Sequence, residues 1–306
     1  MSTERTVVVT GASAGLGYWS AEQLAAAGHR VVLATRSPER AAAAERSIRQ
    51  HVPDATLAHL HVDLADLDSV RRAADDLGAL GPVDALVNNA GVVGSGTRRS
   101  TAQGLELQVG TNHVGHFALT GLVLPMLEQT AGRVVHLGSI AHRWATLDPR
   151  DPLGAGRYSS YRQYGRSKLA VMLFGFELAQ RLADAGSSVS SIVAHPGLSL
   201  DALAPARPAV QPARAEPAWT RPGQRLYAQG KDAGALPIVH AAVGATSGPD
   251  AVRSGQYWGP GGPLQLRGPV SVVTAEPRAH DRTEAARLWV ASEHASGVAF
   301  ALDALV

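Results

Sequence analysis

Six short apolar segments recur through the first two hundred residues and alternate with longer segments rich in Ala and Leu. The short segments have the length and continuous apolar character of strands buried on both faces, and they are Thr6–Thr10, Arg30–Ala34, Thr56–His61, Val83–Val87, Arg133–Leu137 and Val189–Ala194. The longer segments have the composition of helices, and they cover residues 17–27, 38–50, 67–78, 101–130 and 162–185. This alternation predicts an α/β fold with a doubly wound parallel sheet, right-handed crossovers and helices on both faces.

The regular alternation weakens after Pro196. Residues 199–226 are rich in Pro, Ala and Arg, a composition that favours a mobile flap or a loose helical hairpin over a packed element. No second hydrophobic core is indicated, so residues 1–306 are expected to form a single domain. The expected parts after the sheet are a flexible flap at 199–230, a helix near 231–246 and a C-terminal extension at 247–306 with a helix at 281–295.

The composition excludes several kinds of site. The 306 residues carry a formal net charge of only +2, so nothing indicates a surface for nucleic acid. There are no cysteines, which excludes disulfides, thiolate metal sites and a cysteine nucleophile. The sequence shows no signal pattern after Met1 and no apolar run of membrane-spanning length. We therefore expect a cytoplasmic protein that binds neither nucleic acid nor a membrane.

A glycine-rich turn follows the first expected strand and opens the first expected helix. It reads Thr10-Gly-Ala-Ser-Ala-Gly-Leu-Gly17, with the spacing G-x-x-x-G-x-G instead of G-x-G-x-x-G. Glycines let the backbone approach a diphosphate closely, and free N–H groups at a helix N-terminus attract its negative charge. The strand, turn and helix together indicate a dinucleotide site, and a tight turn without a ligand is the structural alternative.

The end of the second expected strand indicates which dinucleotide would bind. An acidic residue there would accept hydrogen bonds from a ribose 2′-OH, whereas a guanidinium group suits a 2′-phosphate. Thr35 stands where the acid is expected, and Arg36 follows it. The sequence therefore favours NADP(H) over NAD(H), and an arginine on a solvated loop is the alternative.

Tyr164 and Lys168 lie four residues apart in an expected helix, which places them on one face, one turn from each other. The nearby Tyr158 and Tyr161 have no lysine at this spacing. An ammonium group stabilises the phenolate of tyrosine, whose ordinary pKa of about 10 makes it a poor acid–base group near neutral pH. Alone, this spacing is common by chance, and a pair on a surface helix is then the better interpretation.

Together, these motifs resemble the short-chain dehydrogenase/reductase family. The resemblance covers roughly residues 6–200, with weaker similarity through 231–270. Each motif alone is unspecific, but the ordered set is very specific. The set consists of the glycine turn, Asp63-Leu64, Asn88-Asn-Ala-Gly91, Asn112, Ser139, Tyr164 with Lys168, and His195-Pro-Gly197. The long gap between Ser139 and Tyr164, with Ser139-Ile-Ala-His142, is similar to the retinol-dehydrogenase-like branch.

The resemblance implies a Rossmann fold that transfers a hydride between a nicotinamide and a carbonyl–alcohol pair. Tyr164 would act as acid or base, Lys168 would lower its pKa and bond the nicotinamide ribose, and Ser139 would donate a hydrogen bond to the substrate oxygen. Asn112 would hold a water that links Lys168 to solvent. The implied cofactor-binding residues are Gly11, Ser13, Gly15, Leu16, Gly17, Arg36, Asp63, Leu64, Asn89, Ala90, Gly91, Tyr164, Lys168, Pro196, Gly197 and Ser199.

Two positions depart from the family pattern. Gly138 stands before the catalytic serine, where relatives often have a second serine. Asp201 stands where a threonine commonly contacts the carboxamide of the nicotinamide. An acid at that position would disfavour the phosphates of the cofactor or redirect the flap.

The sequence therefore predicts an NADP(H)-dependent carbonyl reductase or alcohol dehydrogenase, with a small-molecule ketone, aldehyde or alcohol as substrate. One alternative is a redox-neutral enzyme of the same fold, such as an epimerase, dehydratase or cyclase, and another is a protein that binds and senses NADP(H). NADPH consumption with a ketone would separate them. The substrate pocket is expected between the 143–160 insertion and the flap, whose arginines 207, 214, 221 and 225 indicate either an acidic ligand or a solvated loop.

No metal site is expected. The pairs His59/His61 and His113/His116 each lack a third ligand nearby, and packing explains them more simply. The family implies a homodimer or homotetramer formed through the helix that bears Tyr164, and a monomer is left open.

Overall fold

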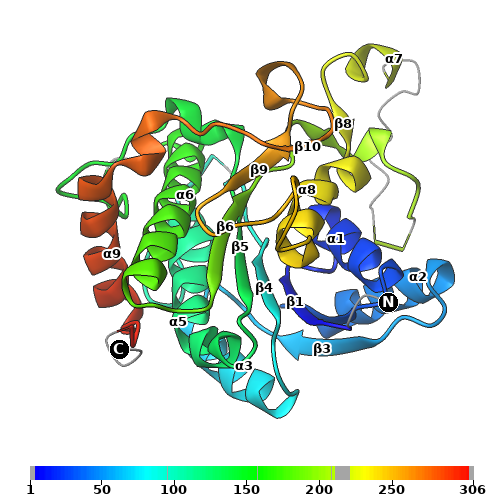
Figure 1. The fold of residues 1–306 in the computed structure, drawn as a ribbon. Coiled ribbons are helices and arrows are strands. Elements are labelled where there is room, and N and C mark those ends of the chain that lie inside the picture. Colours follow the sequence, from blue (N-terminus) through cyan, green and yellow to red (C-terminus); the bar gives the residue numbers. More distant parts are fainter. Residues whose placement is uncertain (1–3, 95, 157, 208, 211–220, 303–306) are drawn as a thin grey trace.

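The computed structural model describes residues 4–94, 96–156, 158–207, 209–210 and 221–302. Within these residues, eight strands form a central sheet in the order β10-β9-β6-β5-β4-β1-β2-β3 (Figure 1). The strands of this sheet are β1 (Thr6–Thr10), β2 (Arg30–Thr35), β3 (Leu57–His61), β4 (Ala85–Asn88), β5 (Arg133–Leu137), β6 (Ser190–Ala194), β9 (Tyr257–Pro260) and β10 (Val270–Val272). All neighbours are parallel except β9 and β10. The strand order reverses between β1 and β4, and ligands of doubly wound sheets bind at such a point.

The six strands expected from the apolar segments are confirmed, whereas β9 and β10 were not expected. β9 lies in a segment rich in Gly and Pro, a composition that is typical of loops and gave no indication of a strand. Tyr257 and Trp258 are buried, and a Cβ on Gly259 would overlap with the ring of His195. The glycine in this strand therefore serves close packing against the neighbouring segment and does not mark a turn.

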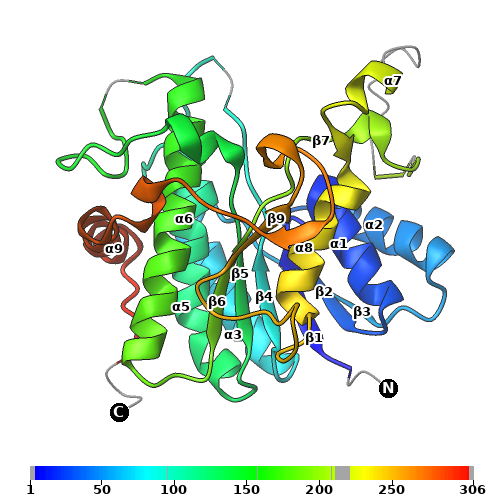
Figure 2. The same cartoon turned by 45° about the horizontal axis from the view of Figure 1, so that its top comes forward.

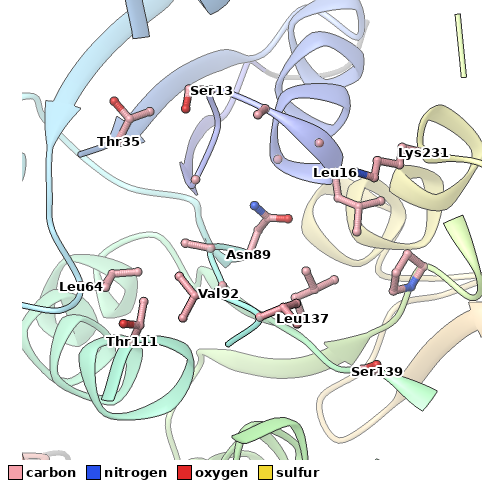
Figure 3. A pocket seen from close by; sticks show the side chains of 18 of the residues that line it. Ser13, Leu16, Thr35, Leu64, Asn89, Val92, Thr111, Leu137, Ser139 and Lys231 are labelled. Carbon is pink, nitrogen blue, oxygen red and sulfur yellow. The ribbon is translucent and has the colours of Figure 1, made fainter. Parts of the chain in front are cut away.

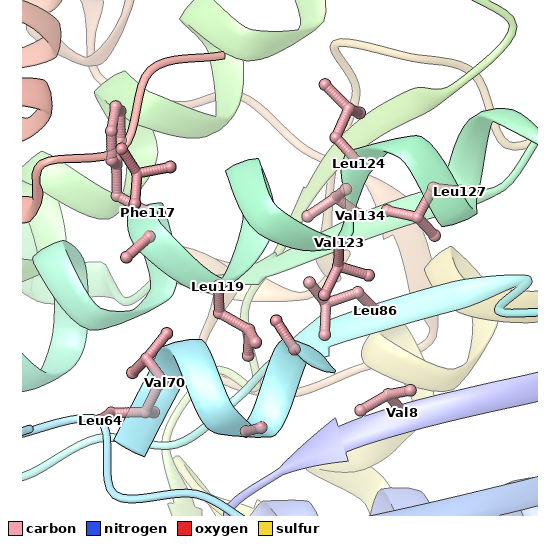
Figure 4. Close-up of a cluster of buried hydrophobic side chains, with 14 of the residues drawn as sticks. Val8, Leu64, Val70, Leu86, Phe117, Leu119, Val123, Leu124, Leu127 and Val134 are labelled. Atoms are coloured by element: carbon pink, nitrogen blue, oxygen red, sulfur yellow. The ribbon is translucent and has the colours of Figure 1, made fainter. Parts of the chain in front are cut away.

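Helices cover both faces of the sheet (Figure 2). Within β1, Val7 and Val9 pack in one core cluster with α1 and α8, whereas Val8 packs in another with α3 and α5 (Figure 4). This alternation is what a strand buried on both faces requires. The helices are α1 (Gly15–Ala26), α2 (Pro38–His51), α3 (Leu67–Ala79), α4 (Leu107–Val109), α5 (Gly115–Glu128), α6 (Ser160–Asp184), α7 (Arg221–Gln224), α8 (Lys231–Val243) and α9 (Arg282–Ser296).

The helix expected at 101–130 is shorter than expected and has a break in its regular hydrogen bonding. It begins at α4, where the Glu106 carboxylate caps the first turn by accepting bonds from the N–H groups of Gln108 and Val109, both at 3.0 Å. A π-helical segment, η1 (Gly110–Val114), then precedes α5. Segments of this kind often occur at functional sites, and this one contains Asn112.

The described parts of the flap make specific contacts with the rest of the protein. Ser199–Leu200 (β7) pairs in parallel with Gln229–Gly230 (β8). Arg207 forms an ion pair with Glu22 of α1 at 2.7 Å and lies over the ring of Trp19. This arginine therefore fastens the flap to α1. Arg214 and the side chain of Arg221 lie outside the described residues.

The C-terminal extension contributes both unexpected strands and the helix α9, which packs on α5 and α6. Four rings make this contact, with centroid separations of 4.7 to 6.0 Å, and they belong to Phe117, Phe174, Trp289 and Phe300. α9 thus covers the outer side of the helix that bears Tyr164. Among the helices of the described residues, none has both the length and the apolar content needed to cross a membrane.

Candidate active site

A cavity of about 730 Å³ lies at the carboxyl ends of the central strands (Figure 3). This volume is in the range of sites that bind cofactors and small molecules. Every residue expected to bind the cofactor lines the cavity. Of the catalytic candidates, Ser139, Tyr164 and Lys168 line it, whereas Asn112 is not among its lining residues.

The glycine turn forms one wall of the cavity and is shaped to accept a ligand. Gly11 and Gly15 have φ angles of +67° and +57°, values that favour glycine. A Cβ on Gly17 would overlap with Gly11 O and the Asn89 amide, so the third glycine permits the first turn of α1 to pack closely. Ala14 at the N-cap provides no side-chain hydrogen bond to the helix. The first N–H groups of α1 therefore lack a side-chain cap and suit a diphosphate.

The end of β2 gathers positive charge. Arg36 and Arg40 both line the cavity, together with Ser37, the N-cap residue of α2. Thr35 is buried and donates through Oγ1 to Ser37 O at 3.3 Å, so no acid stands at this point. Arg36 was expected from the sequence, whereas Arg40 was not. Arg40 could have been found in the sequence from its position four residues after Arg36, in the first turn of α2.

Thr10 joins the glycine turn to the turn after β4. Its Oγ1 accepts hydrogen bonds from the N–H groups of Asn89 and Ala90, both at 2.9 Å, and donates to Val87 O. Asn89 Nδ2 donates to Thr10 O at 2.7 Å. These hydrogen bonds hold the two turns, which form two walls of the cavity, in a fixed position relative to each other.

Two buried polar atoms have no hydrogen-bond partner within the described part of the chain although their residues line the cavity. They are Asn89 Oδ1 and Thr111 Oγ1. A buried polar group without a partner is unfavourable unless a ligand or water completes it. Both atoms are therefore suited to contact a bound dinucleotide. Thr111, which lies in η1, was not expected from the sequence.

The catalytic candidates converge at the end of β5. Ser139 lies two residues after that strand, and Tyr164 and Lys168 occupy successive turns of α6. A hydrogen bond joins the side chains of Ser139 and Tyr164. Lys168 Nζ donates to Leu137 O, the last residue of β5, at 2.9 Å. The strand end is itself secured, because the N–H of Gly138 donates to Ala194 O at 2.8 Å.

Burial shifts both titratable groups of this cluster toward their neutral forms. It raises the pKa of the Tyr164 hydroxyl, which the hydrogen bond with Ser139 acts to lower. It lowers the pKa of Lys168 from 10.5 to about 8. The Tyr164 hydroxyl is thus protonated at neutral pH, and its phenolate would need added positive charge nearby.

Asn112 lies beside this cluster, but its side chain is bonded to the loop that contains Val92. Its Nδ2 donates to Ser167 Oγ at 3.0 Å and to Val92 O at 3.1 Å, and its Oδ1 accepts from the N–H of Val92 at 2.7 Å. The ring of His116 bonds to the Asn112 backbone oxygen at 2.9 Å and, on its other side, to Thr10 Oγ1 at 2.9 Å. These contacts tie η1 to both α6 and the glycine turn. The water expected at Asn112 stays a prediction.

The segment after β6 reaches the cavity through Pro196, Gly197 and Ser199, as expected. Gly197 has a φ of +64°, and Ser199 Oγ donates to Pro196 O at 2.7 Å. Asp201 is paired with Lys231 at 2.6 Å, so its carboxylate is not an isolated charge. Lys231 also lines the cavity and was not expected from the sequence.

At least one histidine of each pair has a side-chain partner in the protein. His59 is paired with Glu45 at 2.8 Å, and His113 Nε2 bonds to Ser292 Oγ at 2.7 Å. Across the ranges that the structure describes, no group of three or more His, Asp or Glu residues could hold a metal ion.

The fold and cavity define an α/β protein whose site is shaped for a dinucleotide. The family model described as short chain dehydrogenase matches residues 5–203. The chain belongs to this family, and its relatives place it in the retinol-dehydrogenase-like branch.

Two curated relatives show how far the similarity extends. The chain is 44% identical over 201 residues to a polyprenol dehydrogenase of Mus musculus, and 39% identical over 198 residues to retinol dehydrogenase 13 of Homo sapiens. These matches cover 63% and 64% of this chain and 59% of each relative, so the chain spans less than two thirds of their length.

A solved structure supports the same assignment. The complex of Pseudomonas aeruginosa RhlG with NADP has a TM-score of 0.60 and 26% sequence identity with this chain. The similarity covers 84% of this chain and 94% of that one.

Proposed function

We propose that this oxidoreductase interconverts an alcohol and a ketone or aldehyde with NADP(H), and that Tyr164 exchanges the proton with the substrate oxygen. The observation that carries the proposal is the convergence of Ser139, Tyr164 and Lys168 on one cavity with the uncapped N-terminus of α1. When bound, the nicotinamide dinucleotide supplies or accepts the hydride.

In the reducing direction, Tyr164 gives its hydroxyl proton to the oxygen of the carbonyl as that oxygen gains negative charge. Ser139 donates a hydrogen bond to the same oxygen, a contribution of about 2–4 kcal/mol when the donor is well aligned. The resulting phenolate is stabilised by the ammonium of Lys168, one helical turn away, and regains a proton from solvent. In the oxidising direction these proton movements reverse.

The preference for NADP(H) is proposed from the charge at the end of β2. Arg36 and Arg40 supply two guanidinium groups, which suit a 2′-phosphate. The N-terminus of α2 lies between them in sequence and adds backbone N–H donors, whereas the hydroxyl of Ser37 already donates to Glu39 Oε2 at 2.6 Å. RhlG, whose structure contains NADP, offers a precedent among similar folds.

The substrate proposed here is a lipophilic alcohol or carbonyl compound. Trp144 follows Ser139 closely, and its ring lies parallel to that of Tyr161, one turn before Tyr164, with centroids 6.0 Å apart. Both rings are about half exposed or more, and Val93, which lines the cavity, is 74% exposed. Contiguous apolar surfaces mark binding sites, and the two stacked rings are proposed to form such a surface next to the cavity. The names of the relatives, a polyprenol and a retinol dehydrogenase, agree with this chemical class.

The arginines of the flap give no support to an acidic substrate. Arg207 is engaged with Glu22, and Arg225 is exposed and is not among the residues that line the cavity. A cytoplasmic location also remains our proposal, to be tested by cell fractionation.

The variant Tyr164→Phe tests the proposed function. It should abolish reduction of ketones and aldehydes by NADPH while NADPH still binds within about threefold of the parent affinity, because only the transferable proton is removed. Tyr227→Phe, an exposed tyrosine of the flap, is the matched control and should leave turnover unchanged. Full activity of Tyr164→Phe, or substrate conversion without NADPH consumption, would reject the proposal.

A further inference from the structure

Lysine is nearly absent from this chain. Of its 28 lysine and arginine residues, only Lys168 and Lys231 are lysines. Both of them line the same cavity. Lys168 belongs to the catalytic group, whereas Lys231 belongs to none of the motifs that identified the site. Both lysines of the chain therefore lie at the same cavity.

Lys231 is the first residue of α8, and its side chain reaches the N-terminal end of α1. Its Nζ lies 3.4 Å from the position that a Cβ of Gly15 would occupy. Figure 3 shows the same side chain beside Leu16. Gln23 Nε2 donates to Asp232 O at 2.8 Å, which fastens the start of α8 to α1. The ammonium group is thus held beside the uncapped N–H groups of the glycine turn.

Asp201 determines where this ammonium group lies. The two groups are 2.6 Å apart, and the Lys231 side chain is only 25% exposed. An ammonium group has three N–H donors, so one can remain on Asp201 while another is available to a ligand. A carboxylate alone would repel a diphosphate at this point, and its pairing with Lys231 removes that repulsion.

We propose that Lys231 is a cofactor-binding residue that contacts the diphosphate of the dinucleotide, with Asp201 keeping its ammonium group over the glycine turn. This inference rests on the proposed function, because it requires a dinucleotide in the cavity. Diphosphate is common to NADPH and NADH, so the contribution of Lys231 should be the same for both. Arg36 and Arg40 would instead act on the 2′-phosphate, which only NADPH carries.

Binding measured by titration of protein fluorescence, without turnover, tests this assignment. Lys231→Met should weaken NADPH and NADH by the same factor, roughly tenfold, as expected for one charge-assisted contact. It should leave the affinity for adenosine 2′-monophosphate unchanged, because that ligand has no diphosphate. Lys231→Arg should retain most of the affinity. Asp201→Asn should bind both dinucleotides at least as tightly as the parent, because the amide Oδ1 can still accept a hydrogen bond from Lys231 and keep it in place while the negative charge is removed.

Arg225→Met is the matched control, since it removes an exposed cation from the nearby flap without touching the cavity, and it should bind like the parent. If the ion pair only fastened the flap, Lys231→Met and Asp201→Asn would weaken binding alike, and that result would overturn the assignment. Parent-like affinity of Lys231→Met would overturn it as well. Failure of the parent to bind either dinucleotide would instead reject the proposed function itself. Thermal unfolding of each variant confirms that the compared proteins are folded.

Discussion

Lys168 is predicted to reduce the stability of the folded protein. The residue is only 5% exposed, and within the described residues it forms no ion pair. Among the residues described, the hydrogen bond that its side chain forms runs from Nζ to Leu137 O. Burial lowers its pKa from 10.5 to about 8, so at neutral pH the folded protein holds a buried ammonium group that would be better solvated in the unfolded chain.

The size and pH dependence of this effect follow from the pKa shift. With about 1.4 kcal/mol for each pKa unit, the shift from 10.5 to about 8 destabilises the folded state by about 3 kcal/mol at pH 7. The penalty is present in full below pH 8, where the side chain is protonated in both states. It declines as the pH rises from 8 to 10.5, because the folded protein has then lost the proton that the unfolded chain still binds. Above pH 10.5 the penalty is absent.

Lys168→Met removes the charge and preserves the length of the side chain. It loses the hydrogen bond to Leu137 O, worth about 1 kcal/mol, so the net gain in the free energy of unfolding at pH 7 is about 2 kcal/mol. For a chain of this size, such a gain raises Tm by about 3 °C. The variant should be inactive, because the phenolate of Tyr164 loses its cation.

Chemical unfolding of the cofactor-free parent and variant, measured from pH 6.5 to 10, checks this prediction. The stability difference should be largest below pH 8 and should shrink toward pH 10. Lys231→Met, which loses an ion pair on a less buried side chain, serves as the control and should show no stabilisation. A variant less stable than the parent at pH 7, or a difference that does not depend on pH, would refute the reasoning.

Three further predictions concern the cofactor, the substrate and the core. Arg36→Ala and Arg40→Ala should each weaken NADPH at least tenfold and NADH less than twofold in equilibrium titrations, and equal losses would count against a 2′-phosphate contact. Trp144→Ala should raise KM for long-chain apolar substrates roughly tenfold with kcat nearly unchanged, and an unchanged KM would remove the ring from the substrate site. Trp289→Ala should lower the free energy of unfolding by about 3–5 kcal/mol in urea, because its ring is buried among three phenylalanines. The adjacent Val290→Ala, 64% exposed, should change it by less than about 0.5 kcal/mol, and similar losses in both variants would contradict this account.

The features that the sequence predicts well are those with a local signal. Strands buried on both faces must be apolar throughout, so six strands could be located from five or six residues each. Because parallel strands end at one edge, the motifs that follow them had to meet, and they do meet in the cavity. Gly11 and Arg36 are predictable for this reason.

The features that escaped prediction depend on contacts between distant residues. β9 looks like a loop because its Gly259 is required only by the ring of His195, more than sixty residues earlier. Lys231 belongs to no sequence motif, and only its contacts with Gly15 and Asp201 in the folded protein indicate a role at the site. A single sequence contains these contacts but gives no local sign of them.

The surroundings of the two lysines predict how each position would tolerate an arginine. At position 168 the cation is buried, and a group with a pKa near 8 can share or release a proton there, whereas a guanidinium group stays charged. At position 231 the cation is partly exposed and paired with a carboxylate, so a permanent charge is tolerated. Lys231→Arg should therefore keep cofactor affinity, whereas Lys168→Arg should lose both activity and stability. If the two substitutions behaved alike, burial would not be what distinguishes these sites.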